Sequence, residues 1–298
     1  MAWRIPRIGF VAAVALAAGL SGCNLLAASR DSARLHEQAQ AALTRWADAV
    51  EAAGGPSAFI PVGELTSQVG DWEENVGSNN KPALGAGLIE ADVSLSAETP
   101  PDGQVRWQDG STADVRLISA QQALSELKAD GAGECPDCVP LRITAALLKT
   151  GPVRTSRGQA EAPVWEFALQ GTSVRVIRVA VANRVSVVPP PWDANDPPVG
   201  ISIESATVAA GGRLLTVSFV GAPAPGDQPC GADYTAEAVE STIAVVVIVT
   251  EYRHAALGEA CLAIGALRTA DAQLAAPLDG RAVLEVREAL PVPVLPAP

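Results

Sequence analysis

The sequence predicts a mainly β protein of the α+β class, with a helix near its N-terminus and antiparallel strands beyond it. Three observations predict this class. Residues 30–53 repeat apolar side chains every three to four positions, as on one face of a helix. From Leu88 onward, apolar and polar residues alternate over short stretches, as in strands. Beyond residue 200, several such stretches follow one another with turn residues between them, which is typical of a β-sandwich-like domain.

Residues 1–22 are expected to be a lipoprotein signal peptide and not part of the fold. Arg4 and Arg7 precede an apolar run over residues 8–20, which is shorter than the roughly 20 residues of a membrane-spanning helix. The run ends in Leu-Ser-Gly-Cys, a lipobox in which Cys23 receives a diacylglyceryl thioether before cleavage. Acyl chains such as palmitate would then hold the chain at the cell membrane, on its extracytoplasmic face. An ordinary secretory signal with a chance cysteine is the alternative.

Residues 23–56 are predicted to form the lipidated N-terminus and an amphipathic helix. Ser29 and Asp31 are candidate helix caps, and Gly54-Gly55-Pro56 ends the periodic stretch. The apolar face of the helix comprises Leu35, Ala39, Ala42, Leu43, Trp46 and Val50. We expect this face to pack on the globular body of the protein.

Residues 57–187 are predicted to form a β-rich domain with one short helix. Asp109-Gly110 lies between two strand-like stretches and indicates a hairpin. Ser119 and Gln122 have the spacing of a capping box, so a helix is expected to start there and to end at Gly131. The strongest strand patterns cover 141–147, 165–169 and 174–181. The last of these slips phase at Val176-Ile177, which indicates either a bulge or a strand that is buried on both faces.

Residues 188–199 are rich in proline and are expected to be a stiff linker. Residues 200–290 should form the β-sandwich-like domain, and residues 291–298 a loose proline-rich tail. The expected strands of this domain are 201–208, 214–220, 234–240, 243–251, 263–274 and 281–287. Residues 243–249 are nearly all aliphatic, which predicts a central strand.

The composition restricts the partners of the protein. Its net charge is −12, and the loss of Arg4 and Arg7 with the signal would make it more acidic. An acidic surface repels phosphate groups, so we expect no nucleic-acid partner and no flat docking on anionic lipid beyond the acyl anchor.

Besides Cys23, the chain contains Cys135, Cys138, Cys230 and Cys261. An even number of cysteines in an oxidising compartment indicates disulfide bonds. Several pairings are open, and the sequence favours Cys135–Cys138 and Cys230–Cys261, because each pair lies in its own segment.

Several motifs in two later segments are similar to those of a family of uncharacterised actinobacterial lipoproteins and secreted proteins. The first segment contains Cys138, Thr155-Ser156-Arg157-Gly158, Trp165, Phe167 and Arg178-Val179-Ala180-Val181. The second contains Cys230, Tyr234, Glu240-Ser241, Cys261, Arg268, Gly280-Arg281 and Pro291. The resemblance covers roughly residues 133–291. It implies a location outside the cytoplasm and carries no activity.

Motifs with catalytic potential are better explained structurally. Cys135 and Cys138 could form a redox dithiol, but a strand pattern follows them where such a motif needs a helix N-terminus. Ser125-x-x-Lys128 and Lys149-Thr150-Gly151 match motifs of penicillin-recognising enzymes, but too few residues separate them. Zinc held by the four cysteines, calcium at Asp193, Asn195 and Asp196, and catalysis by His36 or His254 are disfavoured by spacing. We therefore expect no metal and no cofactor.

The candidate ligand surface is the hairpin that contains Arg157, Trp165 and Glu166. Its alternative interpretation is a core aromatic residue with charges at the rim. We expect an extracytoplasmic lipoprotein that binds an envelope protein or a small ligand, or that forms part of the cell envelope, without catalysis. The alternative is an extracytoplasmic enzyme or a thiol-redox accessory protein that uses Cys135 and Cys138.

Overall fold

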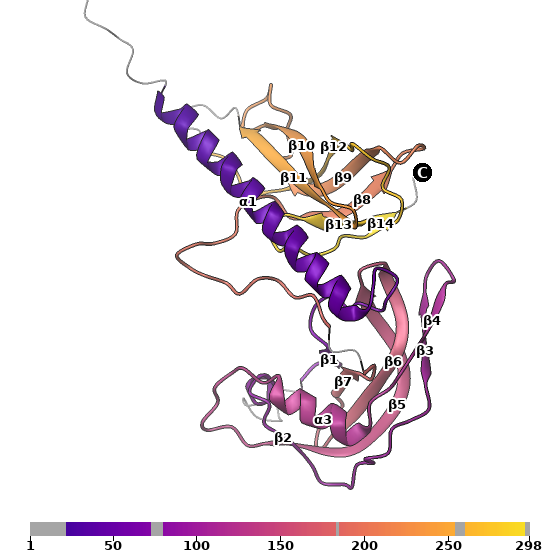
Figure 1. Cartoon of the computed structure of the whole chain (residues 1–298). Helices are drawn as coiled ribbons and strands as arrows, with labels where there is room; N and C mark the ends of the chain where they lie inside the picture. The colour runs from indigo at the N-terminus through magenta and orange to yellow at the C-terminus, as the bar shows by residue number, and fades with distance from the viewer. Residues whose placement is uncertain (1–21, 73–79, 183–184, 254–259, 296–298) are drawn as a thin grey trace, which may run out of the picture.

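The structure is a computed structural model that describes residues 22–72, 80–182, 185–253 and 260–295. Within these residues the protein is mainly β, with a long N-terminal helix and antiparallel sheets, as the sequence predicts. The strands are grouped in two lobes (Figure 1). The first lobe comprises residues 57–187 and the second lobe residues 200–295. Residues 1–21, which contain nearly all of the expected signal, lie outside the described part of the chain.

Helix α1 spans Gly22–Ala53 and therefore starts earlier than the sequence predicts. The expected caps, Ser29 and Asp31, are wrong, because both residues lie inside the helix. The predicted end is confirmed. Gly54 and Gly55 both have positive φ angles, and the Gly55 N–H donates to the Val50 carbonyl at 2.9 Å, which closes the last helical turn.

The apolar face of α1 packs on the second lobe (Figure 1). Its neighbours are the central strand β11, Ala244–Arg253, and the adjacent strand β13, Ala282–Glu285. The contact involves Ala42, Trp46 and Val50 from the helix and Val246, Ile248 and Leu284 from the two strands. Side chains on alternate positions of β11 face opposite ways, so the helix covers one face of the sheet and leaves the other for a second layer.

The first lobe is built on one sheet. Its elements are β1 (Thr66–Val69), α2 (Asn80–Gly85), β2 (Ile89–Ala91), β3 (Gly103–Trp107), β4 (Thr112–Val115), α3 (Ala120–Ala129), β5 (Leu141–Thr155), β6 (Gly158–Leu169) and β7 (Arg175–Val179). Strand β6 pairs with β5 along one edge and with β3 and β7 along the other, all antiparallel. Strand β7 also pairs with β1, and β2 adds to β5 in parallel.

The sheet of the first lobe is covered on both faces around β6 and β7. Trp165 and Phe167 of β6 pack with α3 on one face, while Val164 packs with β3 on the other. Strand β7 is also buried on both faces, since Val176 packs in the core with Trp165 and Phe167, and Val179 packs in the core with Val164. Its pairing with β6 is regular, so the phase slip in its sequence reflects burial on two faces and not a bulge.

The hairpin and the helix predicted in the first lobe are both present. Strands β3 and β4 pair antiparallel around the Asp109-Gly110 turn. Ser119 caps α3 by accepting a hydrogen bond from the Gln122 N–H at 3.1 Å. The second half of the capping box is missing, because the Gln122 amide donates to Glu126 instead.

The second lobe is a sandwich of two sheets, with α1 as a third layer. Its remaining strands are β8 (Ile203–Val208), β9 (Leu214–Gly221), β10 (Ala232–Glu240), β12 (Ala266–Gln273) and β14 (Val294–Leu295). One sheet has the order β10-β11-β13 and the other the order β12-β9-β8-β14. Val245 and Val247 of β11 meet Val217 and Phe219 of β9 in the core between the sheets. Strand β11 is thus buried on both faces, which confirms the central strand predicted for 243–249.

The linker and the tail are both attached to the body of the protein. Residues 188–199 are held against α1, since Arg45 donates to the Val188 carbonyl at 2.6 Å and Gln38 to the Val199 carbonyl at 3.2 Å. In the tail, β14 pairs with β8 in parallel, so the prediction of a loose tail is wrong as far as Leu295. Residues 296–298 lie outside the described ranges.

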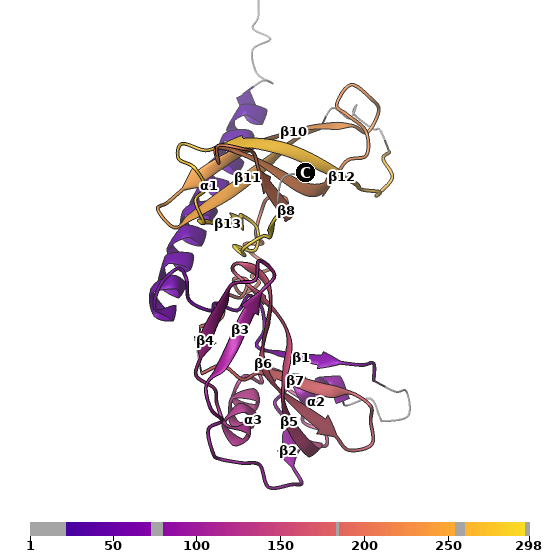
Figure 2. The same cartoon turned by 90° about the vertical axis from the view of Figure 1, so that its right-hand side faces the viewer.

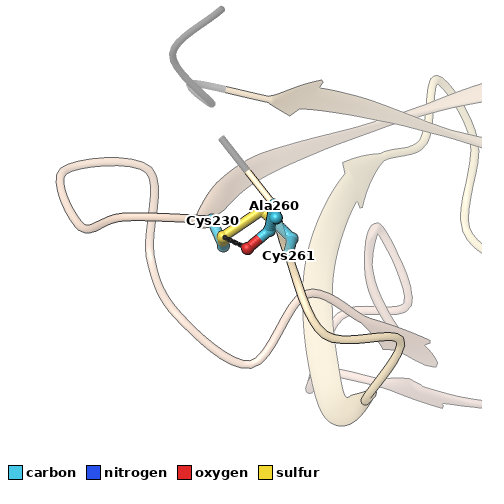
Figure 3. The surroundings of a disulfide bond; sticks show 3 residues. All are labelled: Cys230, Ala260 and Cys261. Atoms are coloured by element: carbon cyan, nitrogen blue, oxygen red, sulfur yellow. Dashed lines mark hydrogen bonds between the residues drawn. A yellow bond between two sulfur atoms is a disulfide. The ribbon is translucent and has the colours of Figure 1, made fainter. Parts of the chain in front are cut away.

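The structure joins the cysteines in the pairs that the sequence favours. Cys135 and Cys138 are linked within the loop between α3 and β5. Cys230 and Cys261 are linked between the segments that precede β10 and β12, with Cα atoms 5.6 Å apart (Figure 3). Figure 3 also marks the 3.9 Å approach of Cys230 Sγ to the Ala260 carbonyl. A disulfide sulfur carries no hydrogen, so this approach is a packing contact.

Candidate functional site

The three residues of the predicted ligand surface lie in different surroundings. Trp165 is buried, and its indole N–H donates to the Ile118 carbonyl at 2.9 Å, which matches the alternative of a core aromatic residue. Glu166 points to the other side of β6 and forms an ion pair with Lys149 at 2.8 Å. Arg157 lies at the β5–β6 turn, away from both. The structure therefore does not bring the three side chains together.

Arg157 is part of a polar cluster at the tips of two hairpins. Its guanidinium lies 4.2 Å from the centre of the Trp107 ring and donates to Ser111 Oγ at 2.7 Å and to Asp109 at 3.3 Å. Trp107 donates in turn to Thr155 Oγ1 at 3.0 Å, which ties the β3–β4 hairpin to the β5–β6 turn. The Ser111 hydroxyl and N–H, together with Arg157, hold the pKa of Asp109 below its usual value.

This cluster forms one wall of a cleft between the lobes. The two hairpin tips of the first lobe point toward the second lobe (Figure 2). The space between them has a volume of about 600 Å³, within the range of about 300–1,000 Å³ that is typical of ligand sites. Asp109, Ser156 and Arg157 line it from the first lobe, and Trp46 of α1 lines it from the side.

The second lobe supplies an apolar wall with a paired cation at its edge. The apolar lining comprises Val208, Ile243, Leu278, Val283, Val292 and Val294. Arg281 borders this wall and donates to Glu240 at 2.7 Å and to the Ala276 and Pro277 carbonyls at 2.8 and 2.9 Å. These bonds fix the loop that precedes β13. Sequence reasoning missed Trp107, Asp109 and Arg281 as site residues, because no local signal shows that two hairpin tips meet the far end of the chain.

The cleft is suited to binding. One wall offers the Arg157 guanidinium and the Ser156 hydroxyl, and the other offers aliphatic surface, mainly from Val208, Ile243 and Val294. The cleft therefore complements a molecule with an apolar body and a polar or anionic end. Both arginines are already paired with carboxylates, which leaves each of them oriented and partly neutralised. Among the described residues, no three His, Cys, Asp or Glu side chains are positioned to hold a metal ion.

Of the candidate catalytic serine, lysine and histidine residues, those that the structure describes do not line this cleft. Ser125 and Lys128 lie on α3, and Lys149 lies on β5 in its ion pair with Glu166. His36 Nε2 lies 3.5 Å from Glu237 Oε1, on the surface where α1 meets β10. His254 lies outside the described residues.

The acidic residues of the linker are also accounted for. Asp193 accepts a hydrogen bond from the Asn195 N–H at 2.8 Å, and Asp196 pairs with Arg34 of α1. These carboxylates therefore hold the linker in place. The described helices include none that is long and apolar enough to cross a membrane.

Comparisons of this chain with protein-family models, with curated proteins and with solved structures gave no match.

Proposed function

We propose that this protein is an extracytoplasmic lipoprotein, anchored to the cell membrane through Cys23, that binds a ligand or an envelope partner in the cleft between its lobes without catalysing a reaction. The observation that carries this proposal is the cleft itself. It combines a polar wall from one lobe with an apolar wall from the other. Its charged side chains are paired with each other and not arranged as a nucleophile and a base.

The position of Cys23 supports the anchor. Helix α1 begins at Gly22, and its apolar face is fixed on the second lobe. An acyl group on Cys23 would therefore be coupled to the folded body through a rigid helix. Two acyl chains suffice to hold a protein stably at a membrane.

The alternative of a thiol-redox protein has weaker support. Cys135 and Cys138 are joined in a loop that leads into β5, and Cys138 is half-buried against the core of the first lobe. A redox-active dithiol gains its reactivity from a helix that follows its first cysteine, because the helix dipole lowers the pKa of that thiol. Here a strand follows.

The anchor and the binding site are tested separately. Cys23→Ala should abolish partitioning of the protein into a detergent phase, and unchanged partitioning would refute the anchor. For the cleft, the purified protein is incubated with envelope extract and examined by native mass spectrometry. We expect a bound mass that Ser156→Trp, which fills the cleft, removes. The control Leu148→Trp, at an exposed position on β5, should retain it. A bound mass that survives Ser156→Trp, or no bound mass at all, would contradict binding in the cleft.

A further inference from the structure

One end of the second lobe presents a group of exposed apolar side chains, which we call the apolar tip. It consists of Val220, Leu262, Ile264 and Leu267, whose exposed fractions are 54%, 80%, 60% and 66%. Leu267 pairs with Val220 across β12 and β9, and the Gly265 backbone lies directly against the Val220 side chain. The four residues therefore form one surface. The Cys230–Cys261 disulfide fixes this end, since Cys261 precedes Leu262.

The apolar character is confined to that end of the sheet. Farther along the same outer face, Thr216 of β9 donates to Asp271 of β12 at 2.6 Å, and the neighbouring residues Ser218 and Thr269 are also polar. A hollow of about 530 Å³ adjoins the tip, between Leu262 and the loop at Pro223. Such a gradient from apolar to polar along one face is expected of a surface that meets an apolar medium at one end only.

The apolar tip lies at the end of the molecule where α1 begins. His36 of α1 approaches Glu237 of β10, while Trp46, farther along the helix, lines the cleft together with Ile243, which follows β10. The helix and β10 therefore run in the same direction, and the start of α1 lies toward the same end as Cys230. In Figures 1 and 2 the loops that precede β10 and β12 lie at the upper end of the second lobe, as the start of α1 does, and the width of the lobe separates them from the helix.

We propose that the apolar tip docks into the surface of the membrane to which Cys23 is anchored, as a second contact beside the acyl chains. This inference rests on the proposed lipid anchor. The lipid bilayer is the favoured occupant because the tip lies at the end of the second lobe toward which α1, the helix that carries Cys23, begins. Apolar side chains enter the boundary between headgroups and acyl chains without requiring anionic lipid, so this contact differs from the flat docking on anionic lipid that the acidic charge of the protein disfavours. Two attachment points would hold the second lobe at the membrane and direct the first lobe away from it.

The test uses the full, lipidated chain in vesicles of phosphatidylcholine brominated on its acyl chains, since bromine quenches tryptophan that enters the bilayer. Leu262→Trp is the probe, and Leu267→Trp is a second probe on a strand. Leu214→Trp is the matched control, because Leu214 lies on the same face of β9 at its other end and is 38% exposed. We expect the emission added at position 262 or 267 to be lower in brominated than in unbrominated vesicles, because an apolar side chain docked at the interface lies near the acyl chains, and the emission added at position 214 to be the same in both.

Two other results would overturn the proposal in distinguishable ways. If the chain stays on the vesicles and none of the three added signals is quenched, the anchor stands and docking of the tip is wrong. If the chain does not stay on the vesicles, the anchor fails and docking fails with it. If the tip instead joins two copies of the chain, the tryptophans at positions 262 and 267 would not be quenched and the protein would be a dimer in detergent. Leu262→Asp would then prevent dimerisation.

Discussion

Removal of the Cys230–Cys261 bond should destabilise the second lobe and α1 together. The bond closes a segment with a sequence separation of 31 residues, which contains the β10–β11 hairpin. A disulfide that closes a loop of this length lowers the conformational entropy of the unfolded chain, and in the chain-entropy model this stabilises the folded state by about 3–4 kcal/mol. For a unit the size of α1 plus the second lobe, this loss corresponds to a decrease in melting temperature of about 10–15 °C.

The structure also defines which parts should unfold together. Trp46 and Val50 of α1 share a core with Val246 and Ile248 of β11, so the helix should melt with the second lobe. The sheet of the first lobe has its own two cores and should keep its own transition. Differential scanning calorimetry of Cys230→Ser/Cys261→Ser should therefore show one transition that moves and one that does not.

Cys135→Ser/Cys138→Ser is the matched control for this experiment. Its bond has a sequence separation of only 3 residues, so its loss should cost about 1–2 kcal/mol and affect the first lobe instead. The reasoning is refuted if the two thermal transitions shift equally in either variant. It is also refuted if loss of the Cys230–Cys261 bond lowers a melting temperature by no more than loss of the Cys135–Cys138 bond.

Three further results are expected. Burial raises the pKa of Glu285 despite hydrogen bonds from nearby backbone N–H groups, so the folded protein binds this proton more tightly than the unfolded chain. The free energy of unfolding should then decline as pH rises from about 4.5 through the raised pKa of Glu285. The urea midpoint of Glu285→Gln should not show this decline with pH. A decline equal to that of the native chain would contradict the role of Glu285. Arg281→Met should cost about 1.5–3 kcal/mol in urea denaturation, because it removes the charged partner of Glu240 and leaves this carboxylate with the hydrogen bond from the Ala275 N–H; a loss below 1 kcal/mol would argue against this role. The Cys135–Cys138 pair should not reduce insulin above background, and turnover near that of a thioredoxin control would establish redox function.

Local patterns predicted the elements whose side chains repeat clearly. The aliphatic run at 243–249 became the strand that is buried on both faces, and the alternation of Trp165, Phe167 and Leu169 placed these residues on one face of β6. Strand β1 gave no such signal, because three of its four residues are exposed. The start of α1 was missed because the apolar residues at 25–28 break the spacing from which the helix was identified.

The candidate site was harder to predict, because its parts lie far apart in the sequence. The sequence indicates Arg157, but its partners Trp107 and Asp109 lie on another hairpin, and Arg281 lies in the other lobe. The sequence places Trp165, Glu166 and Arg157 on one hairpin. In the structure, Trp165 and Glu166 lie on opposite faces of their strand, and Arg157 lies at the turn. Long-range pairing of this kind, including the parallel contact of β13 with β11, leaves no trace in local periodicity.

The packing of α1 on β11 and β13 also determines the order in which the protein can fold. A chain made from its N-terminus exposes the face with Ala42, Trp46 and Val50 early, but the strands that cover this face come about 200 residues later. The first lobe needs no residue beyond 187 to complete its sheet. It can therefore fold before β11 and β13, the strands on which α1 packs, have been synthesised. Docking of α1 must therefore be a late step in folding. Until then the apolar face of the helix is exposed and is a binding site for a chaperone.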